Sequence, residues 1–142
     1  MAIAALDLGK RRIGIAIADN EGLAVHAIGA LERRSVVRDL ESIRARLVEF
    51  EVSLVIVGLP LNMDGSTGPA ARAAETFATR LREACGLPVD LFDERLSSFE
   101  AEERLRESSG KHVRDKGRID AVAASVILES WLRQRQEEGE NG

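Results

Sequence analysis

Cysteine and aromatic residues are scarce in this sequence of 142 residues. Cys85 is the only cysteine, so the chain can form neither an internal disulfide nor a thiolate metal cluster, and a reducing cytoplasm is its simplest setting. There is no tyrosine, and four phenylalanines and one tryptophan are too few for a platform that stacks the bases of single strands. The helical spacing around Trp131 predicts a core residue instead.

Long apolar runs are also missing. No run approaches the roughly 18–20 residues that cross a bilayer, and the N-terminus lacks the pattern of a signal peptide, so we expect a cytoplasmic protein without a membrane segment. The net charge of −4 argues against a nonspecific nucleic-acid coat protein, which is usually basic. Cations nevertheless cluster at residues 10–12 and 111–118, and most are arginine, which suits bidentate contacts to phosphate.

The length fits one ordinary domain, and an apolar content of 44% supports a full core. Apolar alternation and short apolar runs predict strands over residues 2–8, 12–19, 24–31, 53–60 and 87–94. Helical spacing, with a capping box at Ser97 and Glu100, predicts helices over residues 36–50, 69–84, 98–108 and 118–136. We expect one domain over residues 1–137 and a disordered tail over residues 138–142.

The connections between these elements predict the fold class. Short, turn-like links join the first three strands into an antiparallel meander, whereas the later strands are joined through helices and must run parallel. We therefore expect an α/β fold, with a five-stranded mixed sheet, helices on both faces and the second strand antiparallel to the rest. The carboxyl ends of parallel strands meet at one edge of such a sheet, where ligands bind.

Acidic residues stand in apolar surroundings near that edge. Asp7 closes the first predicted strand, and Asp93 and Glu94 close the last. Asp120 lies on the apolar stripe of the final helix. Each acid also has an ordinary structural explanation. Asp7 can accept hydrogen bonds from turn amides, and either Asp93 or Glu94 can form an ion pair with Arg95. Asp120 can interact favourably with the dipole of the helix on which it lies. Their shared location favours a site, because burying an unpaired carboxylate costs several kcal/mol or more.

The predicted sheet brings Asp7 and Glu94 close enough to share a metal ion. With one strand between theirs, a strand spacing of about 4.8 Å puts their Cα atoms about 10 Å apart. Oxygen ligands without cysteine or histidine select Mg²⁺ or Mn²⁺. Two such ions about 3.5–4 Å apart are the usual arrangement for in-line phosphodiester hydrolysis. Alternation along the strand lets only one of Asp93 and Glu94 face the ions, and the longer Glu94 suits the gap better.

Four motifs resemble the YqgF/RuvX family: DLGKRRIGIA from Asp7, GLPLNMDGS from Gly58, DERLSS from Asp93 and KGRIDAVAASVILE from Lys116. The resemblance covers essentially the whole predicted domain. It implies the RNase H-like fold, with strand order 3-2-1-4-5, and a nuclease that resolves Holliday junctions or matures ribosomal RNA precursors. Whether branched DNA or RNA is the main substrate stays open.

The resemblance also implies roles for individual residues. Asp7, Glu94 and Asp120 become a catalytic triad that binds two Mg²⁺ or Mn²⁺ ions. Substrate contacts are implied for three cations and for the 58–68 loop, represented here by Arg12, Arg95, Lys116 and Asn62.

The segment 108–117 adds two further candidates for substrate contact, Lys111 and Arg114. A cationic loop beside a metal site can close on a phosphate backbone when substrate binds, at some entropic cost. The alternative is an ordinary flexible connection before the final helix.

We therefore expect a metal-dependent endonuclease that hydrolyses phosphodiester bonds of branched DNA or of a ribosomal RNA precursor at its 5′ end. One alternative is a noncatalytic scaffold in RNA processing. A less favoured one is a module related to actin-like ATPases, whose phosphate-binding turn also reads Asp-x-Gly-x(4)-Gly, although those enzymes need two lobes. Symmetric cleavage of two junction strands would favour a homodimer.

Overall fold

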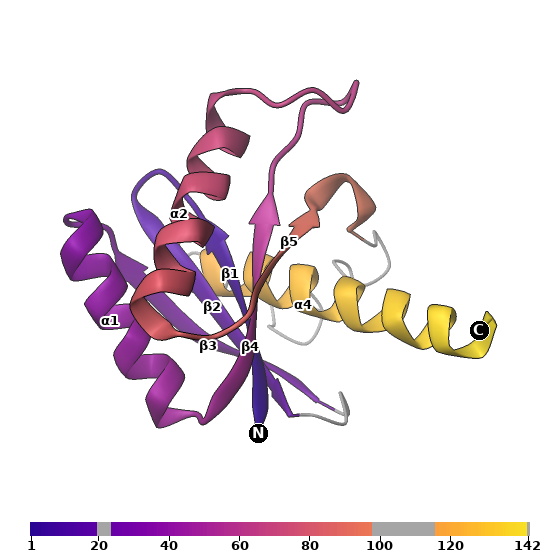
Figure 1. The fold of residues 1–142 in the computed structure, drawn as a ribbon, viewed down its shortest axis with the longest axis horizontal. Coiled ribbons are helices and arrows are strands. Elements are labelled where there is room, and N and C mark those ends of the chain that lie inside the picture. The colour runs from indigo at the N-terminus through magenta and orange to yellow at the C-terminus, as the bar shows by residue number, and fades with distance from the viewer. Residues whose placement is uncertain (20–23, 98–115, 142) are drawn as a thin grey trace.

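The computed structural model describes residues 1–19, 24–97 and 116–141 (Figure 1). Within them, strands form one five-stranded sheet in the order β3-β2-β1-β4-β5. The strands are β1 (Ala2–Leu8), β2 (Arg12–Asp19), β3 (Val25–Glu32), β4 (Val52–Leu59) and β5 (Val89–Asp93). β2 is antiparallel to β1 and β3, whereas β1, β4 and β5 run parallel. The predicted strand order and directions are confirmed.

Helices cover both faces of this sheet. They are α1 (Val36–Glu49), α2 (Pro69–Cys85), α4 (Lys116–Asn141) and the short 3₁₀ helix η1 (Glu94–Leu96). Figure 1 shows α1 and α2 on one face and α4 crossing the other. None of the helices described is both long enough and apolar enough to span a membrane.

Side-chain alternation along β1 divides the core into two layers. Ala4 and Leu6 belong to the layer packed against α1 and α2, whereas Ile3 and Ala5 belong to the layer packed against α4. Because successive strand residues point to opposite faces, Asp7 follows Ile3 and Ala5 onto the α4 face. The pattern that builds the core therefore also aims this carboxyl toward α4.

Local sequence signals explain most of the element boundaries. Ser35 caps α1 by accepting a hydrogen bond from the Arg38 backbone N–H at 3.2 Å. Pro69 occupies the first position of α2, and Gly86 ends that helix in the left-handed conformation with φ of 67°. The predicted helix over residues 98–108, with its capping box, lies outside the described residues.

Several predicted boundaries differ from the observed ones, and two of the differences have a physical reason. β5 ends at Asp93 rather than at residue 94, because the Asp93 side chain accepts a hydrogen bond from the Arg95 N–H and starts η1. The final helix runs through Asn141, so residues 138–141 are helical where a disordered tail is predicted. Arginine, glutamine and glutamate are good helix formers, and they carry the helix past the single glycine near its end.

A glycine allows α4 to approach the sheet closely. Gly14 of β2 pairs with Asp7 of β1. A Cβ atom at Gly14 would overlap the backbone carbonyl of Asp120 in α4. The absence of a side chain there places the Asp120 backbone directly over the strand that neighbours Asp7.

Replacing this glycine should destabilise the protein. Gly14→Ala should lower the free energy of unfolding by about 1–3 kcal/mol, because the new methyl group meets backbone that can move only with the whole helix. Urea denaturation measures this loss. The control is Gly139→Ala, where the new Cβ contacts nothing within 4 Å and stability should change by less than about 1 kcal/mol, in the stabilising direction. Equal stability of the two variants would contradict the close approach.

Candidate active site

The carboxyl ends of β1 and β5 deliver two acidic side chains to the same face of the sheet. Phe92 of β5 belongs to the core layer against α4, so Glu94, two residues later, returns to that face at the start of η1. The side chains of Asp7 and Glu94 are hydrogen-bonded to each other. One strand, β4, lies between theirs, as predicted.

Asp120 lies beside this pair but is not part of it. Its carboxyl is close enough to Asp7 to act on that group electrostatically. Its Oδ2 atom is 3.9 Å from the Nη1 atom of Arg12, the first residue of β2. Within residues 1–19, 24–97 and 116–141, no three acidic, histidine or cysteine side chains are gathered tightly enough to hold a metal ion. The structure therefore joins two members of the predicted triad and places the third next to them.

Burial and mutual repulsion favour the protonated form of the pair. Burial is the largest cause that raises the pKa of Asp7, and the Asp120 charge raises it further, while the hydrogen bond with Glu94 opposes both. The pKa of Glu94 is raised to about 7 by burial first, then by the Asp7 charge and by its hydrogen bond to Asp7. A cation bound in place of the shared proton would offset the repulsion between the two carboxylates.

Asp93 has a different partner from Glu94. Its carboxylate accepts hydrogen bonds from Nε and Nη2 of Arg95, the latter at 2.7 Å. This guanidinium holds the pKa of Asp93 below its usual value. The sequence allowed either strand-end acid to pair with Arg95, and the structure assigns the ion pair to Asp93.

Arg95 also reaches the loop that connects β4 to α2. Its Nη1 donates to the Met63 carbonyl oxygen at 3.4 Å. Inside the loop, Ser66 donates from Oγ to Asp64 at 2.6 Å and accepts from the Asn62 side chain at 2.9 Å. The predicted contact residue Asn62 is therefore exposed but held in place.

The remaining predicted cations are only partly described. Lys116 is the first residue of α4, but its side chain lies outside the described part of the structure. Lys111 and Arg114 lie outside the described residues altogether.

Sequence reasoning missed the two glycines that surround the carboxyl pair. Gly14 admits α4, and Gly58 of β4 leaves the space next to the Glu94 carboxyl. A signal was present, because an isolated glycine inside a strand pattern often marks a close approach of another group.

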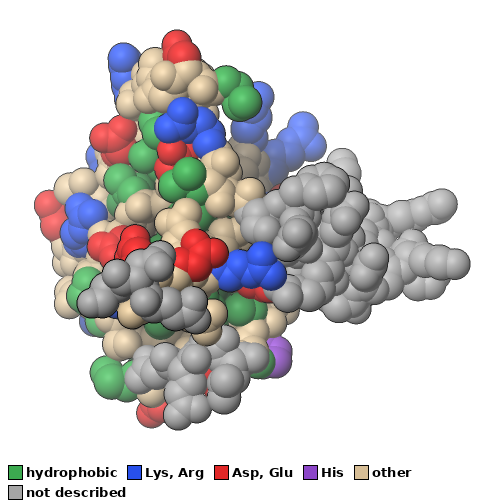
Figure 2. All heavy atoms as spheres, turned by 90° about the vertical axis from the view of Figure 1, so that its right-hand side faces the viewer, with side chains coloured by type: hydrophobic (Ala, Val, Ile, Leu, Met, Phe, Trp, Pro, Cys, Tyr) green, Lys and Arg blue, Asp and Glu red, His purple; other side chains and the backbone are tan. Residues whose placement is uncertain are grey.

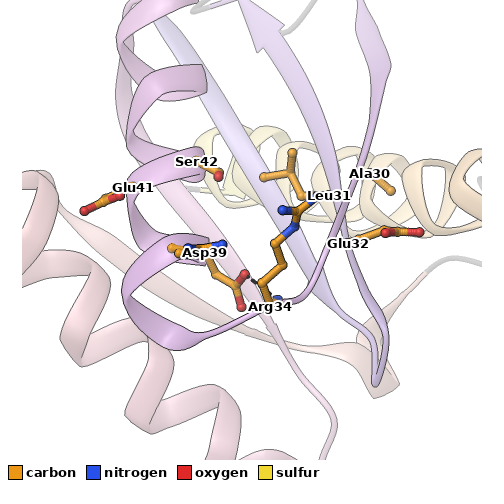
Figure 3. Close-up of a pocket in the computed structure, with 8 residues that line it drawn as sticks. Ala30, Leu31, Glu32, Arg34, Asp39, Glu41 and Ser42 are labelled. Atoms are coloured by element: carbon orange, nitrogen blue, oxygen red, sulfur yellow. Dashed lines mark hydrogen bonds between the residues drawn. The ribbon is translucent and has the colours of Figure 1, made fainter.

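A cavity of about 440 Å³ lies elsewhere, between β3 and α1 (Figure 3). It is lined by Ala30, Leu31, Glu32, Arg34, Arg38, Asp39, Glu41 and Ser42, none of which is a predicted site residue. Its buried carboxyl, Asp39, already accepts from the Arg34 backbone N–H at 3.0 Å and lies 3.9 Å from the Arg33 Nε. Because its lining carries both signs of charge, the cavity favours no particular class of ligand.

The carboxyl pair should make the stability of the metal-free protein depend on pH. Because the folded-state pKa of Glu94 is raised from 4.5 to about 7, its stabilising contribution is complete below pH 4.5 and is lost as the pH rises through 7. Glu94→Gln stays neutral, so its free energy of unfolding should fall less over this range than that of the parent. Urea denaturation in EDTA from pH 4 to 8 measures both curves, and parallel curves would refute the shared proton.

Solved structures with low sequence identity share this fold. Thermus thermophilus RuvC in complex with a Holliday junction substrate superposes with a TM-score of 0.61 at 16% identity, over 95% of this chain and 96% of that one. The fowlpox virus Holliday junction resolvase gives a TM-score of 0.57 at 15% identity, over 94% and 99% of the two chains. The chain therefore has the RNase H-like fold, as the motifs implied.

Relatives with higher identity match nearly end to end. A "Putative pre-16S rRNA nuclease" of Anaeromyxobacter sp. (strain Fw109-5) is 52% identical over 130 residues, which cover 92% of this chain and 95% of the relative. A protein of the same name from Synechococcus elongatus is 45% identical over 132 residues, or 93% and 89% of the two chains. The model of the RuvX family, described as "Holliday junction resolvase", matches residues 1–134. On this match and these identities, the chain belongs to the RuvX family.

Proposed function

We propose that this chain is a divalent-metal-dependent endonuclease that cleaves phosphodiester bonds in structured nucleic acid. The observation that carries the proposal is the pair of half-buried carboxyls, Asp7 and Glu94, hydrogen-bonded where two parallel strands end. Such a pair is costly for the fold alone, which favours a functional explanation. The membership in the RuvX family points to the same activity.

The types of residue present are those that a hard metal ion prefers. Asp7 and Glu94 offer adjacent carboxyl oxygens, the ligands that Mg²⁺ and Mn²⁺ prefer, and Asp120 supplies a third carboxyl beside them. We assign these three residues as the ligands of two ions and as the catalytic residues. The bound ions would activate water and stabilise the charge on the phosphoryl oxygens. The protein holds its carboxyls in a partly buried site where such charges interact strongly.

We propose nucleic acid as the partner, either branched DNA or a ribosomal RNA precursor. Family members carry both descriptions, and RuvC, which shares the fold, has been seen bound to a Holliday junction. On the face in Figure 2, acidic and basic side chains of the described residues are interspersed, so contact depends on particular cations there rather than on a uniformly basic surface. We assign these contacts to Arg12, Arg95, Asn62, Lys111, Arg114 and Lys116.

Arg12 is well placed for this role. Arg12 lies 3.9 Å from Asp120, and Arg95 follows Glu94 directly. Arg12 therefore borders the third carboxyl, where a bound phosphate would need charge compensation, whereas the Arg95 guanidinium lies at Asp93 and the Met63 carbonyl. We further propose one nuclease domain over residues 1–137, a cytoplasmic location and, for symmetric cleavage of a junction, a homodimer.

Metal removal and one substitution test the activity. Cleavage of four-way junctions and of precursor ribosomal RNA should require Mg²⁺ or Mn²⁺ and stop in EDTA, since carboxylates alone cannot stabilise the reacting oxygens. Asp7→Asn should lower cleavage at least about a hundredfold and leave the metal-free fold as stable or more stable, because it removes a charge from a crowded site. Rates and melting temperatures are measured together.

Two outcomes would contradict the proposed function. Full cleavage by protein shown to be free of metal would exclude metal dependence. Binding of RNA by the parent with no cleavage under any metal condition would favour the noncatalytic scaffold.

Substitutions of the neighbouring residues Asp93 and Glu94 should differ sharply in their effect on the rate of cleavage. Glu94→Gln should reduce the rate at least about a hundredfold, because Glu94 contacts Asp7. Asp93→Asn should reduce it less than about tenfold, because Asp93 contacts Arg95 and asparagine retains the capping oxygen for η1. Steady-state rates on the best substrate make the comparison, and a larger loss from Asp93→Asn would reverse the assignment of the two acids.

A further inference from the structure

Gly58 lies in β4 between the two strands that carry the carboxyl pair. β4 is hydrogen-bonded to β1 on one side and β5 on the other, and Gly58 pairs with Phe92 of β5. Ile56 belongs to the core layer against α4, so Gly58 occupies the same face as Asp7 and Glu94. For the two carboxyls to meet, the longer side chain must cross β4 at this residue.

The space above Gly58 is filled by two side chains. A Cβ atom there would lie 3.0 Å from Oε1 and 3.2 Å from Cδ of Glu94, and 2.7 Å from Cδ1 of Ile127 in α4. All three atoms belong to the ends of side chains rather than to backbone. An added methyl group can therefore be accommodated by moving Glu94 and Ile127 without moving α4, unlike the backbone overlap at Gly14.

We propose that Gly58 is a positioning residue for Glu94: its missing side chain leaves the passage through which the Glu94 carboxyl crosses β4 to reach Asp7. The inference rests on the proposed function in one respect, namely that the Asp7–Glu94 pair binds the metal. Gly58 itself contacts neither metal nor substrate. A Cβ atom at this position crowds the Glu94 carboxyl, which must shift by a few tenths of an ångström from its place beside Asp7.

The test is Gly58→Ala, assayed first for Mn²⁺ binding by calorimetry without nucleic acid. We expect the affinity to fall by about tenfold or more, as for other residues that orient metal ligands. Cleavage should fall in parallel. The melting temperature of the metal-free protein should change by only a few degrees, and affinity for a four-way junction in EDTA should stay within about twofold. Mn²⁺ affinity and cleavage equal to those of the parent would overturn the inference.

Ile127→Val distinguishes a conflict between residue 58 and Glu94 from a conflict between residue 58 and the packing of α4. It removes the Cδ1 atom that the methyl group added by Gly58→Ala would meet, so it relieves any conflict with α4 but none with Glu94. We expect Gly58→Ala/Ile127→Val to fold at least as well as Gly58→Ala and to bind Mn²⁺ just as weakly. Recovery of Mn²⁺ affinity in the double variant, or failure of both variants to fold, would assign Gly58 to core packing and overturn the proposal.

Glu94→Asp adds a direct measure of coupling. It should weaken Mn²⁺ binding strongly in the parent but much less in the Gly58→Ala background, because both changes disturb the same carboxyl. If the effects of Glu94→Asp and Gly58→Ala on Mn²⁺ affinity are additive, residue 58 and the Glu94 carboxyl do not compete for the same space, which would contradict the inference. Failure of the parent itself to bind Mn²⁺ would refute the proposed function and the inference with it, whereas binding that Gly58→Ala leaves intact would refute the inference alone.

Discussion

The contact between the carboxyls of Asp7 and Glu94 is the constraint around which the rest of the site is arranged. Two acids that would repel each other in water are held together, partly buried, at the ends of strands that are not themselves neighbours. The fold supplies the free energy to keep them there through its two core layers. Holding two such carboxyls together lowers the stability of the fold, which is why we interpret the pair as functional.

Small residues make that arrangement geometrically possible. Across the α4 face of the sheet, Gly14, Asp7 and Gly58 occupy neighbouring strands, with Glu94 beyond them. One glycine admits the backbone of α4, and the other admits a carboxyl. A side chain at Gly14 would meet the backbone of Asp120, and one at Gly58 would meet the ends of the Ile127 and Glu94 side chains. The site is therefore defined as much by where the strands carry no side chain as by the acids themselves.

Much of the fold could be predicted from sequence because its signals are local. The turn-like links of the meander, the apolar run of β4 and the cap at Gly86 all act over a few residues. Strand alternation likewise indicates that only one of Asp93 and Glu94 can face the site, whereas the preference for Glu94 rests on its longer side chain and on the family resemblance. The 3₁₀ turn after Asp93 was not predicted, because it depends on how Arg95 and the Asp93 carboxyl meet. The pairing of Arg12 with Asp120 joins residues far apart in sequence, and no local pattern indicates it.

The order of the elements along the chain has a consequence for when the site can exist. Asp7 stands near the beginning of the sequence and Asp120 near its end, on a helix that packs across β1, β2 and β3. During synthesis the chain emerges with its N-terminus first, so the early strands are available long before α4. The carboxyls of Asp7, Glu94 and Asp120 come together only after α4 has been synthesised. In the nascent chain, Asp7 is therefore in place before the neighbouring Asp120 carboxyl can join it.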